Sequence, residues 1–303
     1  MLRLVTEAPD KVVRQPLHHA SRTFLFFLIV LFFHWNNGLA ASLTSIQVKQ
    51  GEAMSLKVQV NSSSPVIIGK FRDHKIPFFQ LASSHKYEAL IGVDLAEPPG
   101  IYPVTLADFD GVRLKPVRPY QIKVVPQKFG TQELNLPQEA VDLDPATLAR
   151  VEKEQAEVAA LLDKVTEEKL WESGFLVPVE GKIAGAFGRK RILNGQPRSP
   201  HNGEDIAAPM GTEVHASNTG KVILADDLFF SGKSLILDHG WGIFTMYFHL
   251  SEIGVQLGET VKKGQLIGRV GASGRATGPH LHWGLRLAGA RVNPFSVSRL
   301  SIP

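Results

Sequence analysis

Short runs in which apolar and polar residues alternate fill most of this 303-residue chain. One such run is MSLKVQV at residues 54–60, and another is IFTMYFHL at residues 243–250. Turn sequences rich in glycine, proline, asparagine and aspartate separate the runs. Alternation places every second side chain on the same face of a strand, so the pattern predicts half-buried strands joined by short turns. We therefore expect a mainly β protein.

Beyond the N-terminal segment, interruptions in this pattern divide the chain into three parts. Residues 42–127 contain five alternating runs and no catalytic cluster, which predicts a small β-sandwich-like accessory domain. Residues 144–173 predict a linking amphipathic α-helix, with Asp144 as N-cap and Pro145 in the first turn. Its length favours packing on its own protein, and a partner-binding coiled coil is the alternative. In residues 175–303 strands return with frequent glycines, and this part carries the candidate catalytic residues.

The first 40 residues predict export. Basic residues precede an apolar run at Phe24–Phe33, which is too short to cross a bilayer, since a helix needs about 20 residues. Its length fits the core of a signal peptide, and small residues at 38–42 offer cleavage after Ala40. An uncleaved anchor in the inner membrane, with Trp35 at the interface, is the alternative. Both interpretations place the body of the protein in the periplasm or cell envelope.

Composition excludes several kinds of site. The chain has no cysteine, which removes disulfides, cysteine nucleophiles and thiolate metal ligands, so a metal site must use histidine, aspartate or glutamate. The net charge is +4 at pH 7, but no basic stripe with interleaved aromatic residues is present, and we expect no nucleic-acid partner. Mild positive charge suits contact with an anionic wall polymer. No feature of the sequence indicates an oligomeric state.

Three separated segments carry histidine and aspartate in patterns that suit a metal centre. SPHNGEDIAAP places His201 four residues before Asp205, in a predicted loop that leads into a strand, because a proline and a glycine there disfavour a helix. GPHLHWG places His280 and His282 two residues apart, so both should project from the same face of a strand. Histidine and carboxylate together are a ligand set that suits zinc.

The third segment, TMYFHLS, contains His249. Strand alternation predicts that Met246 and Phe248, with the preceding Phe244, face the core. His249 is then expected on the opposite side, where a polar cleft could lie. A catalytic zinc uses three protein ligands and leaves one position for water. His201, Asp205 and one histidine of the GPHLHWG pair meet that count. His249 and the other histidine are then free for proton transfer and charge stabilisation, two tasks that the sequence does not divide between them.

In their order and context, HNGED, YFHL and GPHLHWG resemble the three motifs of the lysostaphin-type, LytM-like M23 zinc metallopeptidases, a family of peptidoglycan endopeptidases. The resemblance extends over roughly residues 175–298. It implies a C-terminal metallopeptidase domain of the lysostaphin-like type, built on an antiparallel β-sheet and holding one zinc ion. The zinc ligands that it implies are His201, Asp205 and His282, and the catalytic histidines are His249 and His280.

The expected function is that of an exported zinc endopeptidase that cuts peptide cross-links of peptidoglycan. Polyglycine bridges and diaminopimelate-containing stems are both substrates of the family, and analogy of the N-terminal regions favours direct stem cross-links. One alternative is a non-hydrolytic protein that binds peptidoglycan or regulates another wall hydrolase, although all five implied residues are present. Another is an enzyme whose groove is covered by the accessory domain or the helix until they move.

Four further residues of this half have two interpretations each. His215 and His239 are interpreted as structural hydrogen-bonding residues rather than ligands. Tyr247 beside His249 fits either a role in orienting a catalytic group or simple packing. Arg275, in the glycine-rich stretch GASGRATG, fits contact with substrate or a surface position. The glycines themselves are interpreted as shaping the turn before the histidine pair, because no phosphate-binding pattern follows.

Overall fold

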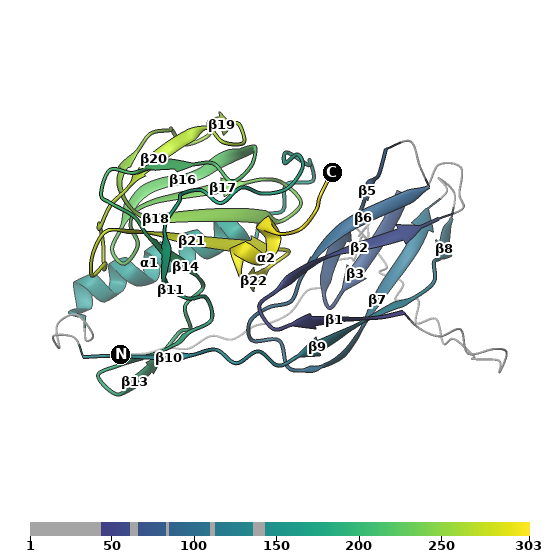
Figure 1. The fold of residues 1–303 in the computed structure, drawn as a ribbon, viewed down its shortest axis with the longest axis horizontal. Coiled ribbons are helices and arrows are strands. Elements are labelled where there is room, and N and C mark those ends of the chain that lie inside the picture. Colours follow the sequence, from purple (N-terminus) through teal and green to yellow (C-terminus); the bar gives the residue numbers. More distant parts are fainter. Residues whose placement is uncertain (1–43, 61–65, 83–84, 110–112, 136–142) are drawn as a thin grey trace, which may run out of the picture. The chain divides into compact units, whose positions relative to one another are not determined.

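The computed structural model describes residues 44–60, 66–82, 85–109, 113–135 and 143–303, which form a mainly β protein (Figure 1). The predicted export segment, residues 1–40, lies outside these described residues. Among the helices of the described ranges, none combines the length and the apolar character needed to cross a membrane. The division into separate domains stays a prediction.

Two sheets form the N-terminal β region. Its strands are β1 (Thr44–Lys49), β2 (Ala53–Gln59), β3 (Val66–Phe71), β4 (His74–Pro77), β5 (Phe79–Gln80), β6 (Lys86–Gly92), β7 (Gly100–Phe109), β8 (Leu114–Pro116) and β9 (Tyr120–Val125). The order β1-β9-β7-β3-β4, with β8 on β7, makes one sheet, and β2-β6-β5 makes the other. Alternate residues of both sheets, including Leu56, Ile91 and Val104, are buried in one shared core. This arrangement agrees with the predicted sandwich.

Helix α1 spans Pro145–Leu162 and begins as predicted. The Asp144 side chain accepts hydrogen bonds from the backbone N–H groups of the next turn and so caps the helix. The helix ends at Leu162, earlier than the predicted end near residue 173. The chain beyond it runs along the C-terminal β region, where Trp171 is buried, and this packing outweighs the helical pattern. Val158 and Leu162 pack on the sheet, as the favoured interpretation of the helix requires.

The C-terminal β region is built on one antiparallel sheet of ten strands. Its order is β11-β14-β21-β18-β17-β16-β19, with β20 paired to β18 and β15, and β22 paired to β21. The strands are β11 (Lys182–Gly185), β14 (Gly203–Ala207), β15 (Glu213–His215), β16 (Gly220–Leu228), β17 (Gly232–Asp238), β18 (Ile243–Ile253), β19 (Thr260–Val261), β20 (Leu266–Val270), β21 (His280–Leu287) and β22 (Ala290–Val292). A separate sheet contains β10 (Thr131–Leu134), β12 (Lys190–Leu193) and β13 (Gln196–Arg198).

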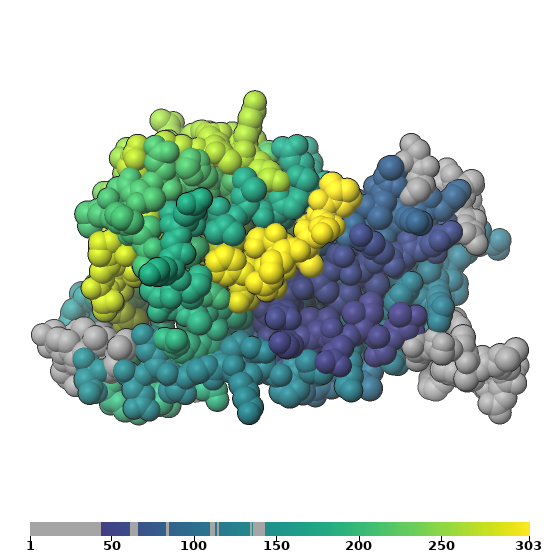
Figure 2. All heavy atoms as spheres, in the orientation of Figure 1, coloured from purple at the N-terminus to yellow at the C-terminus, as the bar shows by residue number. Residues whose placement is uncertain are grey.

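The short helix α2 (Pro294–Ser298) closes the C-terminal β region. Asn293 caps it by accepting a hydrogen bond from the backbone N–H of Phe295. Val297 and Ile302 are buried in a cluster with residues of β21 and β22. In Figure 2 this C-terminal segment, coloured yellow, lies against teal and green residues of the same region.

Two faces of the central strands have different environments. Ile206 on β14, Trp283 on β21 and Tyr247 on β18 point to one face and are fully buried in the main core of this region. Their neighbours Asp205 and His282 are opposite each other in the antiparallel register, and they point to the other face. The sheet thus has an apolar face that stabilises the fold and a second face that carries polar side chains.

We expect Leu237→Ala to destabilise the C-terminal β region strongly, because Leu237 is completely buried in its main core. The loss in the free energy of unfolding should be about 2–5 kcal/mol, from lost apolar contact and the cavity that remains. Leu257→Ala is the matched control, since this side chain is 69% exposed and should change stability by less than about 0.5 kcal/mol. Urea unfolding followed by tryptophan fluorescence measures both, and equal losses would contradict the assignment of the core.

Candidate metal centre

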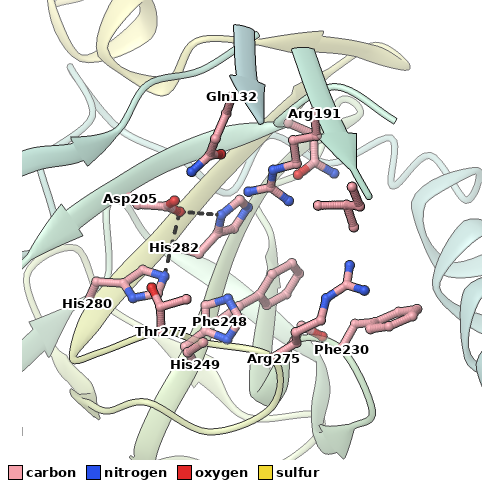
Figure 3. Close-up of a pocket in the computed structure, with 14 residues that line it drawn as sticks. Gln132, Arg191, Asp205, Phe230, Phe248, His249, Arg275, Thr277, His280 and His282 are labelled. Atoms are coloured by element: carbon pink, nitrogen blue, oxygen red, sulfur yellow. Dashed lines mark hydrogen bonds and ion pairs between the residues drawn. The ribbon is translucent and has the colours of Figure 1, made fainter. Parts of the chain in front are cut away.

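A cleft of about 410 Å³ lies in the C-terminal β region and collects four of the five predicted site residues (Figure 3). Asp205, His249, His280 and His282 all line it. The fifth residue, His201, lies beneath the cleft with only 2% of its side chain exposed, in contact with Asp205 and His282. The structure therefore brings together residues that are separated by up to 81 positions in the sequence.

Three of these side chains form a compact set of metal-ligand atoms. His201 Nε2 lies 2.9 Å from Asp205 Oδ1 and 3.0 Å from His282 Nδ1, and Asp205 Oδ1 lies 2.8 Å from His282 Nδ1. Two imidazole nitrogens and a carboxylate oxygen are donors that zinc prefers. A tetrahedral zinc ion with bonds of about 2.0–2.1 Å needs ligand atoms about 3.4 Å apart. The cluster fits such an ion after opening by about 0.4–0.6 Å at each pair.

The local backbone explains why these three residues meet. Asp205 and His282 are direct cross-strand neighbours on β14 and β21, so the register alone places their side chains together. His201 precedes β14, and its Nδ1–H donates to the Ala186 carbonyl at 3.0 Å, which leaves Nε2 with a lone pair toward the cluster. Gly203 leaves room, since a Cβ there would lie 2.6 Å from the His282 ring.

The protonation states also suit a metal. Burial would raise the pKa of Asp205, but the adjacent imidazoles of His201 and His282 hold that pKa well below its usual range, so the carboxylate is ionised. Burial lowers the pKa of His282 to about 4, which keeps the imidazole neutral at pH 7. Metal ligation requires an ionised carboxylate and a neutral imidazole. The cluster meets both requirements near neutral pH.

Two more imidazoles lie beside this cluster, and each has one ring nitrogen that is not hydrogen-bonded to a backbone carbonyl. His249 Nδ1–H donates to the Ser273 carbonyl at 2.8 Å, and His280 Nδ1–H donates to the Gly278 carbonyl at 2.8 Å. Each Nε2 atom then carries a lone pair, and the two ring centroids are 4.8 Å apart. His280 Nε2 lies 3.8 Å from Asp205 Oδ1. Burial lowers the pKa of His249, which favours its neutral form.

The prediction for the two faces of the strand that holds His249 was wrong. Phe248, expected in the core, lines the cleft, and its ring is stacked with the His282 ring at a centroid distance of 5.4 Å. Tyr247, on the face expected to be polar, is buried in the main core. His249 reaches the cleft because the register of β18 shifts there and His249 has a φ of +63°. A positive φ is costly for a residue with a Cβ, and such strain is concentrated at functional sites.

Several residues that line the cleft were not assigned by the sequence, among them Gln132, Arg191, Phe230 and Phe248. Gln132 lies on β10, which pairs in parallel with β12 so that Gln132 is opposite Arg191. Nothing near Gln132 in the sequence indicates a site, because β10 lies far before the motif segments. Arg275, for which two interpretations were open, lines the cleft, and its guanidinium lies 4.1 Å over the Phe230 ring.

Of the two other histidines of this β region, His239 has the structural hydrogen-bonding role that was expected. His239 is completely buried, and its Nδ1–H donates to the Thr219 carbonyl at 2.8 Å. Burial lowers the pKa of His239 to about 4, so this side chain is neutral. His215 lies 3.7 Å from Glu213 and outside the cleft. The Tyr247 hydroxyl is hydrogen-bonded within the core to Ser217 and Thr245, so Tyr247 has a packing role.

Sequence comparison connects the C-terminal half to known proteins. A profile of peptidase family M23 matches residues 199–294. The peptidoglycan DD-endopeptidase ShyA of Vibrio cholerae serotype O1 is 41% identical over 124 residues, which are 40% of this chain and 29% of that protein. The DD-carboxypeptidase/endopeptidase Mpg of Neisseria meningitidis serogroup B is 43% identical over 137 residues, which are 45% of this chain and 31% of that protein. The matched part is about a third of the length of these curated relatives.

Structural comparison extends the similarity over more of the chain. The crystal structure of a Pseudomonas aeruginosa protein, described as a peptidase of family M23, superposes with a TM-score of 0.63. The two chains are 30% identical, and the match covers 80% of this chain and 92% of the other. The common fold therefore includes more than the C-terminal β region.

We expect His201→Ala, Asp205→Ala and His282→Ala each to lose bound zinc, because each substitution removes one donor from the cluster. His215→Ala is the matched control, as it removes a histidine of the same β region that lies outside the cleft. Metal analysis of each purified variant after zinc loading and dialysis gives the result. One zinc ion per chain in Asp205→Ala would contradict the proposed ligand set.

Proposed function

The chain belongs to peptidase family M23, and we propose that it is a zinc endopeptidase that hydrolyses peptide cross-links of bacterial peptidoglycan. The observation that carries this proposal is the five-residue arrangement of the cleft. The three ligand atoms of His201, Asp205 and His282 lie within 4.8 Å of one another, and the imidazoles of His249 and His280 lie directly beside them. The name of the Vibrio relative supports the same substrate, and the name of the Neisseria relative supports an endopeptidase reaction.

The residues of the cleft can divide the work of hydrolysis. Zinc bound to the three ligands would lower the pKa of a bound water toward 7 and polarise the scissile carbonyl. His249 and His280 each present a lone pair on Nε2, so one can accept the proton of the attacking water. The other can stabilise the developing oxyanion or protonate the leaving nitrogen. The water oxygen joins the carbonyl carbon, the C–N bond breaks, and the nitrogen leaves as a free amine.

The proposed substrates are direct stem cross-links, in which a D-alanyl carbonyl is joined to the side-chain amine of diaminopimelate. The Vibrio relative is named a DD-endopeptidase, which supports a bond between two D-centres. Peptidoglycan lies outside the cytoplasm, so the proposed place of action is the cell envelope or periplasm. The segment proposed for export or anchoring, residues 1–40, lies outside the described residues.

A second candidate function is that of an enzyme held partly closed by its own chain. Gln132 belongs to β10, which precedes α1, yet its side chain points into the cleft beside Asp205 and His282 (Figure 3). An amide above a metal site can occupy space that a substrate needs. The position of Gln132 in the cleft therefore favours autoinhibition. A protein that has lost hydrolysis is less well supported, because all five residues that the resemblance implies are present.

Zymography on peptidoglycan tests the proposed reaction directly. The zinc-loaded full chain should clear the substrate, and a chelator should abolish clearing because the reaction needs the metal. Adding zinc after removal of the chelator should restore clearing. Absence of clearing by a chain that holds zinc would reject the hydrolytic function and favour a protein that binds or regulates.

We expect His249→Ala and His280→Ala each to lower kcat by about 10²–10⁴-fold, the range for loss of a general acid or base. Neither side chain belongs to the ligand cluster, so both variants should keep zinc. His215→Ala should keep both zinc and full turnover. Hydrolysis of a purified cross-linked muropeptide, followed by chromatography, measures kcat. Full activity of both cleft variants would contradict the assigned roles.

We expect Gln132→Ala to raise kcat/KM by about two- to tenfold if the amide restricts access, since fewer molecules would then be in a closed state. Thr131→Ala is the control, because Thr131 is exposed and the adjacent side chains of a strand point to opposite faces. The two variants are compared on the same muropeptide at equal zinc content. An unchanged or lower rate in Gln132→Ala would dismiss the autoinhibitory role.

A further inference from the structure

Two arginines enter the cleft from separate segments. Arg191 comes from β12, and Arg275 comes from the loop between β20 and β21. Figure 3 shows both guanidinium groups directed into the space beside His282 and Phe248. The five residues of the proposed reaction do not require either arginine, so their position needs a separate explanation.

Neither arginine is neutralised by the chain. Within the described residues no carboxylate lies within ion-pair distance of Arg191 or Arg275. The one carboxylate among the residues that line the cleft is Asp205, which attracts Arg191 from beyond ion-pair distance and whose Oδ1 already contacts His201 and His282. Burial, with the positive charges of Arg191 and Arg198, lowers the pKa of Arg275, which means that like charges are crowded at this place. An anion between the guanidinium groups would relieve that repulsion.

The Arg275 side chain is held in position before any ligand arrives, and Arg191 is on a strand with a neighbour on each side. The Arg275 guanidinium lies 4.1 Å over the Phe230 ring, and its backbone N–H donates to the Phe230 carbonyl at 2.9 Å. The strand of Arg191, β12, lies between β10 and β13. A guanidinium that is already ordered loses little entropy on binding, and its planar donors match a carboxylate.

We propose that Arg191 and Arg275 bind a free carboxylate of the substrate, on the carbon next to the scissile nitrogen. This inference rests on the proposed function. In a direct stem cross-link the scissile nitrogen is attached to a diaminopimelate carbon that carries such a carboxylate. Amidation of diaminopimelate removes the charge, and a polyglycine bridge has no carboxylate at that position. The arginines therefore select cross-links with free diaminopimelate and discriminate against amidated and polyglycine cross-links.

The test uses two synthetic cross-linked peptides that differ only in whether this carboxylate is free or amidated. We expect the zinc-loaded full chain to prefer the free acid by about 10- to 100-fold in kcat/KM, the effect of one or two charged hydrogen bonds. A pentapeptide that ends in D-alanyl-D-alanine carries a carboxylate at the equivalent position. Its hydrolysis, compared with its amide, shows whether a terminal carboxylate is recognised in the same way.

Arg191→Gln and Arg275→Gln should each reduce this preference at least threefold, and the double variant should reduce it to about one- to twofold, since Gln keeps a polar side chain without charge. The loss should come from the free acid, with the rate on the amidated peptide nearly unchanged. Arg299→Gln is the matched control, because Arg299 is exposed at the C-terminal end of α2 and lies outside the cleft. Zinc content should be the same in all variants.

Binding separates this inference from the proposed reaction. Calorimetry with the zinc-loaded His249→Ala protein, alone and combined with each arginine substitution, gives dissociation constants without fast turnover. Tighter binding of the free acid that depends on both arginines supports the inference, even if the wild-type chain hydrolyses neither peptide and the proposed function fails. Equal binding of the free and amidated peptides, or a preference that survives in the double variant, overturns it.

Discussion

The antiparallel register of β14, β21 and β18 is the constraint on which the site depends. It places Asp205 opposite His282, and His282 opposite Phe248, so that three side chains form one row on a single sheet face. The same register sends Ile206, Trp283 and Tyr247 to the other face, where they make the core. A slip of one residue would exchange these two sets, so the stability of the fold and the geometry of the row are enforced by the same strand pairing.

Backbone carbonyl groups fix most of the imidazoles around that row. His201, His249 and His280 each donate Nδ1–H to a carbonyl of a neighbouring loop, which leaves Nε2 without a proton and pointing to common space. Burial keeps His282 neutral, and the adjacent imidazoles of His201 and His282 keep Asp205 ionised, so the cluster holds a negative charge near its centre. Two unneutralised guanidinium groups border the same cleft. The cleft therefore presents opposite charges in separate places, which suits a polar ligand of defined orientation.

Local patterns in the sequence predicted the mainly β fold, the start of α1 and the projection of His280 and His282 from the same strand face. These features depend on neighbouring residues, through strand periodicity and helix capping. The predicted end of α1 was wrong, because the burial of Trp171 against a distant part of the chain outweighs helix propensity. The predicted orientation of β18 was wrong because His249 has a positive φ and interrupts the alternation of side chains. Residue types alone do not reveal such a backbone conformation. Gln132 and Arg191 were missed because pairing between β10 and β12 joins segments that no motif connects.

The position of β10 has a consequence for how such peptidases are compared and recombined. Its strand contributes Gln132 to the cleft although it precedes α1 and every motif segment. A fragment that starts at residue 175 would keep all five polar residues of the proposed reaction and lose part of the wall around them. Rates measured on such a fragment would describe a wider groove. A chimera that receives only the segment after α1 would carry the reacting residues of this protein but not the complete cleft wall that contributes to substrate selection.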